Sequence, residues 1–136
     1  MTTIHVLLVE DNEDNRDMMK FLLERAGYVV STANTGVEAL TAAHREKPDI
    51  ILMDLSMPEM DGWTAAVEIK KEPDLANIPL IAVTAHTLPG DRRRAFDSGF
   101  DSYISKPINV RMFGVTVAEV LKEKSQKTGD TPPPEG

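Results

Sequence analysis

The sequence predicts an α/β fold in which a doubly wound, five-stranded parallel sheet is covered by five helices on its two faces. Short apolar runs alternate along the chain with longer segments whose apolar residues recur at helical spacing. The short runs are continuously apolar, which is typical of parallel strands buried on both faces. At 136 residues, the chain is long enough for one such domain with its own hydrophobic core.

The first strand is predicted at residues 4–9, IHVLLV, and Gly27 ends the helix that follows it. The apolar face of that helix consists of Met18, Met19, Leu22, Leu23 and Ala26. Because its two methionines are adjacent, we expect one in the core and the other exposed. Residues 28–32, YVVST, form the second strand, and a second helix begins at Thr35 with the T-x-x-E spacing of a capping box.

The rest of the chain repeats this alternation. The remaining strands are predicted at 50–53, 80–84 and 103–105, and the remaining helices at 61–71, 89–98 and 109–124. With right-handed crossovers, this order gives a fold of the flavodoxin-like type. We expect residues 1–124 to form the domain and the polar, Pro-rich residues 125–136 to be a disordered tail.

Charge and composition exclude several classes of protein. A net charge of -7 and a pI near 4.9 argue against direct DNA binding, because no basic face is available for phosphates. The chain has no cysteine for disulfides or thiolate chemistry, and no apolar run of membrane-spanning length. Its start lacks the basic flank of a signal peptide, so a cytoplasmic location is expected.

Polar residues stand directly at the carboxyl ends of four predicted strands. Glu10 and Asp11 follow the first strand, Asp54 follows the third, Thr84 ends the fourth and Lys106 follows the fifth. Ligands of open α/β sheets bind at this edge. We therefore expect three carboxylates, a hydroxyl and an amine to meet at one site.

Three neighbouring carboxylates repel one another unless a cation neutralises them. Mg²⁺ (or Mn²⁺) prefers oxygen ligands and keeps several waters. One such ion and one lysine would balance the charge of the three acids and allow the site to accept a phosphoryl group. Phosphoryl transfer needs mainly positioning and charge stabilisation, and a carboxylate is an accepted nucleophile for it.

The sequence resembles the response-regulator receiver domains of two-component signalling over about residues 4–124. The matching motifs are VEDN at 9–12, LMDLSMPEMDG at 52–62, VTA at 83–85 and YISKP at 103–107. Each is weak alone, but together they stand in the right order on the right elements. The motif sequences VEDN and YISKPI are similar to those of single-domain receivers of the cell-division regulator type and of receivers of hybrid kinases.

The resemblance implies that Asp54 accepts a phosphoryl group from a phosphohistidine partner. Its implied metal ligands are Glu10, Asp11, Asp54 and the backbone carbonyl of Ser56. Thr84, Ala85 and Lys106 would surround the phosphoryl group. Tyr103 would be the aromatic residue that turns inward when the threonine moves, and the Lys106–Pro107 peptide bond is expected to be cis.

The resemblance also implies partners and kinetics. Ser56 and His86 would tune the lifetime of the phosphoryl group. A histidine kinase or histidine phosphotransfer protein in a two-component or phosphorelay pathway would contact Asn12, Asn15, Met18 and Pro107. A downstream protein target would bind the fourth helix, the fifth strand and the fifth helix, and we expect a monomer or a weak homodimer. On this interpretation the chain is not an enzyme beyond its own phosphotransfer and dephosphorylation.

Alternative interpretations stay open. A small phosphohydrolase of the haloacid-dehalogenase type also uses an aspartyl nucleophile and Mg²⁺. Those enzymes have a D-x-D pattern, with a second acid two residues after the nucleophile, where this chain has Ser56. A nucleotide-binding module is weaker, because the turn after the first strand has no glycines to hold phosphates. The chain can also be a receiver from a larger protein, which the sequence does not decide.

Individual residues also have plainer interpretations. Asp54 alone could be a turn residue, and Tyr103 could serve only for packing. Trp63 is expected to pack or lie on the surface, and the run 92–94 is expected to be a solvated helix face. The three histidines are too scattered to form a metal site together.

Overall fold

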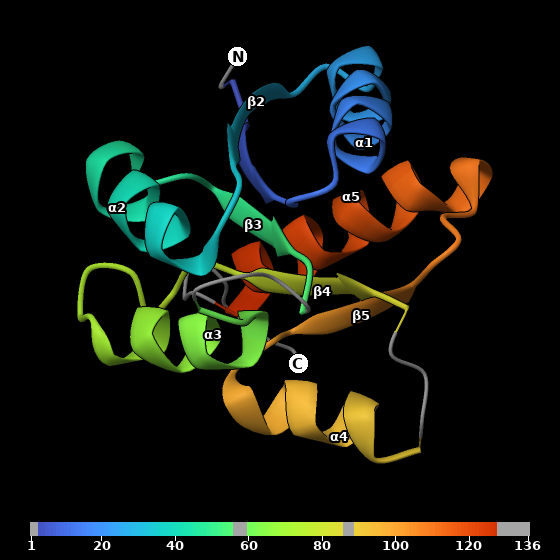
Figure 1. The fold of residues 1–136 in the computed structure, drawn as a ribbon. Coiled ribbons are helices and arrows are strands. Elements are labelled where there is room, and N and C mark those ends of the chain that lie inside the picture. The colour runs from blue at the N-terminus through green and yellow to red at the C-terminus, as the bar shows by residue number, and fades with distance from the viewer. Residues whose placement is uncertain (1–2, 56–59, 86–88, 128–136) are drawn as a thin grey trace.

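The computed structural model describes residues 3–55, 60–85 and 89–127 of the chain. Five parallel strands form one sheet in the order β2-β1-β3-β4-β5, with five helices packed around it (Figure 1). The strands are β1 (His5–Val9), β2 (Val29–Ala33), β3 (Ile50–Met53), β4 (Leu80–Thr84) and β5 (Ser102–Ser105). The helices are α1 (Glu13–Arg25), α2 (Gly36–Glu46), α3 (Gly62–Lys71), α4 (Pro89–Ser98) and α5 (Val110–Lys127). The predicted fold class is therefore confirmed.

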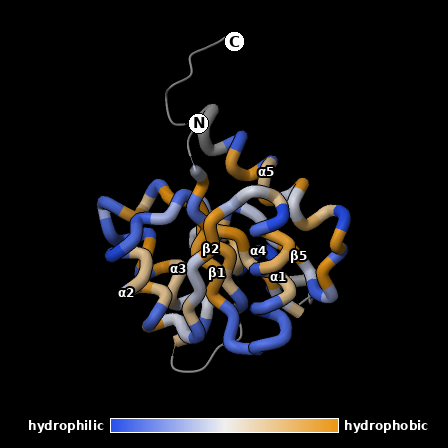
Figure 2. Tube along the Cα trace, turned by 90° about the horizontal axis from the view of Figure 1, so that it is seen from above, coloured by the Kyte–Doolittle hydropathy of each residue, from blue (hydrophilic) through white to orange (hydrophobic). Residues whose placement is uncertain are grey.

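The sheet separates two hydrophobic clusters, because alternate side chains of each strand point to opposite faces. Leu7 and Val9 of β1 pack with α2, α3 and α4, whereas Val6 and Leu8 pack with α1 and α5. Figure 1 shows the same grouping of the helices, and Figure 2 shows the hydrophobic strands inside a more hydrophilic exterior. No helix in the described part of the chain is long and apolar enough to cross a membrane.

The predicted helix ends differ from the structure in several places; α3 and α5, for example, each begin one residue later than predicted. Thr35 caps α2 by accepting a hydrogen bond from the Glu38 N–H at 3.1 Å, but the Glu38 carboxylate accepts from the Asn34 N–H at 2.9 Å. The return bond of the predicted capping box therefore goes to the residue before the cap. Helix α5 continues to Lys127, three residues beyond its predicted end. The expectation of a disordered tail falls largely on residues 128–136, outside the described residues.

The two adjacent methionines of α1 separate as expected. Met19 is 1% exposed in the cluster under α1 and α5, and Met18 is 38% exposed. We predict that Met19→Ala lowers the free energy of unfolding by about 2–5 kcal/mol, because it leaves a cavity. Met18→Ala is the matched control and should change it by less than about 0.5 kcal/mol. Urea unfolding followed by circular dichroism measures both, and equal losses would contradict this assignment of the core.

Candidate functional site

The carboxyl ends of the strands bring the predicted site residues together. Glu10 follows β1 and Asp54 follows β3, and these strands are direct neighbours in the sheet. Lys106, just after β5, reaches across to both acids. Its Nζ lies 2.8 Å from Glu10 Oε1 and 3.2 Å from Asp54 Oδ2. Residues separated by up to 96 positions therefore form one hydrogen-bonded group.

Burial distinguishes this group from ordinary surface charges. The buried polar side chains of the described residues are Glu10 at 1%, Asp54 at 7% and Thr84 at 0% exposure. Thr84 ends β4, and its carbonyl oxygen accepts a hydrogen bond from the Lys106 N–H at 2.9 Å. Burying polar groups costs free energy unless they are paired. Their concentration at one edge of the sheet marks this edge as the candidate site.

Asp11 completes an acidic cluster at the mouth of the site. One carboxylate oxygen from each of Glu10, Asp11 and Asp54 lies within 4.8 Å of the other two, and Asp11 is exposed. Carboxylate oxygens at this spacing are the ligands that Mg²⁺ and Mn²⁺ prefer. The side chains present therefore fit a divalent cation.

The charges of the site depend on one another. Burial raises the pKa of Glu10 above its usual 4.5, and the negative charge of Asp54 adds to the effect, while the hydrogen bond from Lys106 opposes it. Burial alone would lower the pKa of Lys106, but its contacts with Glu10 and Asp54 outweigh burial and raise it. Lys106 is therefore held as a cation between the two acids.

Gly62 fixes the backbone next to Asp54 and was not singled out by the sequence. The Gly62 N–H donates to the Leu55 carbonyl at 3.0 Å, and the Asp54 N–H donates to the Val9 carbonyl at 3.0 Å. A Cβ atom at position 62 would lie 2.4 Å from the Asp54 carbonyl oxygen. The first turn of α3 thus packs directly against the nucleophile candidate, at the DG pair that the sequence showed only as a turn and helix start.

Arginines of α4 contact aromatic rings instead of lying only in solvent. The Arg94 guanidinium lies 3.9 Å from the centre of the Trp63 ring, which connects α4 to α3. Arg92 lies 5.7 Å from the Tyr103 ring and 5.4 Å from the Phe96 ring. The solvated-face prediction was therefore incomplete: these side chains are exposed but stacked.

The Tyr103 side chain is partly buried. Its hydroxyl is buried without a hydrogen-bond partner among the described residues, and its ring packs against the cluster under α2, α3 and α4. Burial raises the pKa of Tyr103, and the charge of Asp91 adds to the shift while Arg92 opposes it. The hydroxyl stays protonated at neutral pH, next to the stacked arginine.

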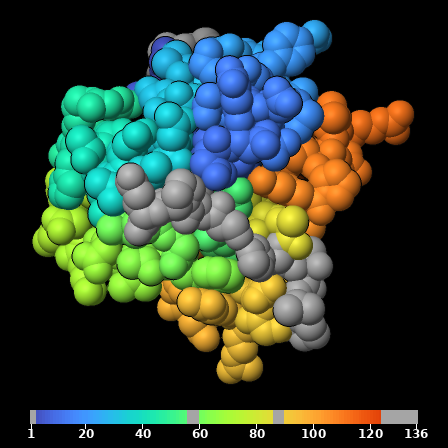
Figure 3. All heavy atoms as spheres, viewed as in Figure 1, coloured from blue at the N-terminus to red at the C-terminus, as the bar shows by residue number. Residues whose placement is uncertain are grey.

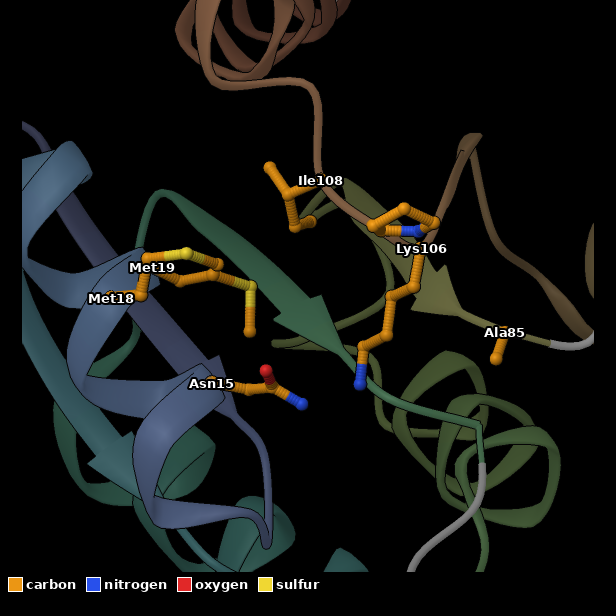
Figure 4. A pocket seen from close by; sticks show the side chains of 7 residues that line it. Asn15, Met18, Met19, Ala85, Lys106 and Ile108 are labelled. Atoms are coloured by element: carbon orange, nitrogen blue, oxygen red, sulfur yellow. The ribbon is translucent and has the colours of Figure 1, made fainter.

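A hollow of about 500 Å³ opens beside the site between α1 and the segment after β5. It is lined by Asn15, Met18, Met19, Ala85, Lys106, Pro107 and Ile108 (Figure 4). Figure 4 shows the Lys106 amine and the Asn15 amide extending into the same space, and Figure 3 shows α1 next to the start of α5 on the surface. Three predicted partner contacts, Asn15, Met18 and Pro107, thus share one hollow. Asn12 instead caps α1, accepting from the Asn15 N–H at 2.9 Å.

Other predictions have different outcomes. The Lys106–Pro107 peptide bond is cis, as expected. Ser56 and His86 lie outside the described residues, so their roles remain predictions. His44 lies near two acids, Glu72 and Asp74, rather than near another histidine. Lys47 Nζ lies 2.9 Å from Asp74, so this second cluster is an exposed network of ion pairs.

The fold and the site together define a class. The family model of the response regulator receiver domain matches residues 6–124 of the sequence. The chain therefore belongs to the response regulator receiver family of two-component signalling.

Among curated relatives, the chain is 41% identical over 116 residues to the polar-differentiation response regulator DivK of Brucella anthropi, covering 85% of this chain and 94% of the relative. Its structure is similar to the chemotaxis response regulator CheY4 of Vibrio cholerae, with a TM-score of 0.83 and 30% identity over 88% of this chain and 99% of that one. The receiver domain of the Pseudomonas aeruginosa sensor histidine kinase PA1611, with magnesium coordinated in its active-site cleft, has a TM-score of 0.83 and 32% identity, covering 89% and 99%.

Proposed function

We propose that this receiver accepts a phosphoryl group on Asp54 from a phosphohistidine of a partner protein and changes its interaction surface as a result. The observation that carries the proposal is the contact of Lys106 with both Glu10 and Asp54, at 2.8 and 3.2 Å, in a largely buried site. A structural carboxylate at a strand end does not need this arrangement. A nucleophile that must accept a charged group does, because charge stabilisation is most of what phosphoryl transfer requires.

A divalent cation, Mg²⁺ or Mn²⁺, would be held by Glu10, Asp11 and Asp54. When bound, it supplies positive charge that orients and stabilises the phosphoryl oxygens. Both carboxylate oxygens of Glu10 already accept hydrogen bonds, Oε1 from Lys106 and Oε2 from the Asn12 N–H at 3.1 Å. We therefore assign Asp54 and the exposed Asp11 as the direct side-chain ligands and Glu10 as a ligand through water. The magnesium in the active-site cleft of the PA1611 receiver supports a divalent-cation site here, and the Ser56 carbonyl remains an expected further ligand.

In the transfer step, an Asp54 Oδ forms a bond to phosphorus as the bond from phosphorus to the partner's imidazole nitrogen breaks. Lys106, kept protonated by the two acids, pairs with the transferred group. Thr84 would donate its hydroxyl to a phosphoryl oxygen, and the exposed Ala85 leaves room for the group. Drawing Thr84 toward the phosphoryl group would open space for Tyr103, whose hydroxyl is buried without a partner among the described residues.

The partner kinase or phosphotransfer protein is expected to dock over the hollow lined by Asn15, Met18 and Pro107, since Lys106 reaches the site from the same hollow. The downstream target is expected on α4, β5 and α5, where Tyr103 and Arg92 lie together. A monomer or weak homodimer in the cytoplasm fits this role.

The test is phosphorylation with acetyl phosphate and Mg²⁺, followed by intact-mass analysis. We predict one base-labile phosphoryl adduct per chain on the wild type and none on Asp54→Asn, which removes the nucleophile but keeps its shape. The matched control is Asp101→Asn, the same substitution at an exposed residue that follows α4, and it should leave the adduct unchanged. An adduct on Asp54→Asn would overturn the assignment, and sustained release of phosphate from phosphate esters would favour a phosphohydrolase instead.

A further inference from the structure

Arg16 of α1 links the acidic turn to a distant loop. Its Nη1 nitrogen donates to two acceptors, the main-chain oxygen of Glu10 at 3.3 Å and Oδ1 of Asn34 at 2.7 Å. Asn34 lies between β2 and α2, and its own N–H donates to Glu38. One side chain therefore connects the end of β1, the start of α1 and the start of α2. No role in the transfer chemistry requires this connection.

The bond to Glu10 has a geometric consequence. The Glu10 carbonyl belongs to the peptide group that joins Glu10 to Asp11, so fixing it sets the direction in which Asp11 leaves the strand. The rest of Glu10 is also held: its N–H donates to the Ala33 carbonyl at 3.1 Å, and Lys106 holds its carboxylate. Arg16 supplies the remaining restraint on the link between the two acids.

We propose that Arg16 and Asn34 are positioning residues for the divalent-cation site. Arg16 orients the Glu10–Asp11 peptide group, and Asn34 holds the guanidinium in the place from which it can do so. The proposal rests on the metal-dependent function proposed above. It assigns neither residue a contact with the ion or the phosphoryl group.

Charge and position act in opposite directions here, which makes the proposal easy to test. A cation beside a metal site repels the ion, so removing Arg16 should tighten metal binding if its charge were all that mattered. If Arg16 positions Asp11, the same change should weaken metal binding, because groups that orient metal ligands contribute to affinity. Asn34 is uncharged, so Asn34→Ala tests the position with no change of charge.

The experiment measures Mn²⁺ binding to the unphosphorylated protein from the electron paramagnetic resonance signal of the free ion. We expect Arg16→Ala and Asn34→Ala each to weaken Mn²⁺ binding about tenfold. The double variant should be little weaker than either single one, because both changes break the same link. Arg25→Ala removes an arginine from the same helix, where it lies over the Phe21 ring, and is the matched control with unchanged affinity. Circular dichroism checks that each variant is folded.

A second readout separates positioning from general damage. The rate of phosphorylation by acetyl phosphate should need more metal in both variants but reach the wild-type maximum at saturating metal. Tighter or unchanged Mn²⁺ binding by Arg16→Ala, or unchanged binding by Asn34→Ala, overturns the inference. If the wild type itself binds no Mn²⁺, the proposed metal site fails and this inference fails with it. Wild-type binding that does not respond to these variants overturns the inference alone.

Discussion

Replacing Gly62 by alanine is expected to lower the free energy of unfolding by about 3 kcal/mol, because it overpacks a rigid part of the molecule. The new Cβ would lie 2.4 Å from the Asp54 carbonyl oxygen and 2.8 Å from the Leu55 Cα. Both atoms belong to the backbone, so neither can rotate away as a side chain would. Relief requires α3 or the end of β3 to move, and movement of the strand end displaces Asp54 from Lys106. Phosphorylation of the folded variant by acetyl phosphate should therefore also be slower.

The matched control is Gly114→Ala in α5. A Cβ at position 114 meets nothing within 4 Å. Alanine is favoured over glycine inside a helix, so this change should raise the free energy of unfolding by about 0.5–1 kcal/mol. Urea unfolding followed by circular dichroism measures both variants. A Gly62→Ala protein as stable and as readily phosphorylated as the wild type would show that the contact with the Asp54 backbone imposes no constraint.

The sequence was sufficient to predict the elements and the edge of the sheet where the site lies. Its apolar runs placed β3 and β4 with the observed bounds, and the residues after the strands placed Glu10, Asp54 and Lys106 at one edge. This works because parallel strands must end together, so position along each strand translates into position in space.

Contacts that depend on side-chain direction were not predictable in the same way. Arg16 and Asn34 are 18 residues apart on elements whose relative placement no local pattern specifies. The run 92–94 looked like a solvated face because charge patterns do not show which rings lie beneath them. Arg94 and Trp63, in contact at 3.9 Å, come from different helices. Tertiary packing, and not local propensity, decides such contacts.

Replacing Lys106 by methionine is expected to have the largest effect of charge on stability. The Lys106 side chain is 17% exposed and contacts two acids whose side chains are 1% and 8% exposed. Removing one partner from a buried ion pair leaves charge without compensation, which costs about 3 kcal/mol at neutral pH. The exposed pair of Lys20 and Glu24 provides the control. Lys20→Met removes the same charge and should cost less than about 1 kcal/mol.

The pH dependence identifies the cause of that loss. Burial holds the pKa of Glu10 above 4.5, and the hydrogen bond from Lys106 limits the shift, so Lys106→Met should raise the pKa further. An acid with a raised pKa stabilises the fold below its unfolded value, near 4.5, and this contribution is lost as the pH rises through the folded pKa. The deficit of Lys106→Met relative to the wild type should therefore be small at pH 4.5 and grow toward pH 8. Urea unfolding across this pH range measures the deficit.

Saturating Mg²⁺ should reduce the deficit at pH 8, because a divalent cation replaces the missing charge. A deficit equal at all pH values and unaffected by Mg²⁺ would mean that Lys106 stabilises the fold by packing and not by its charge.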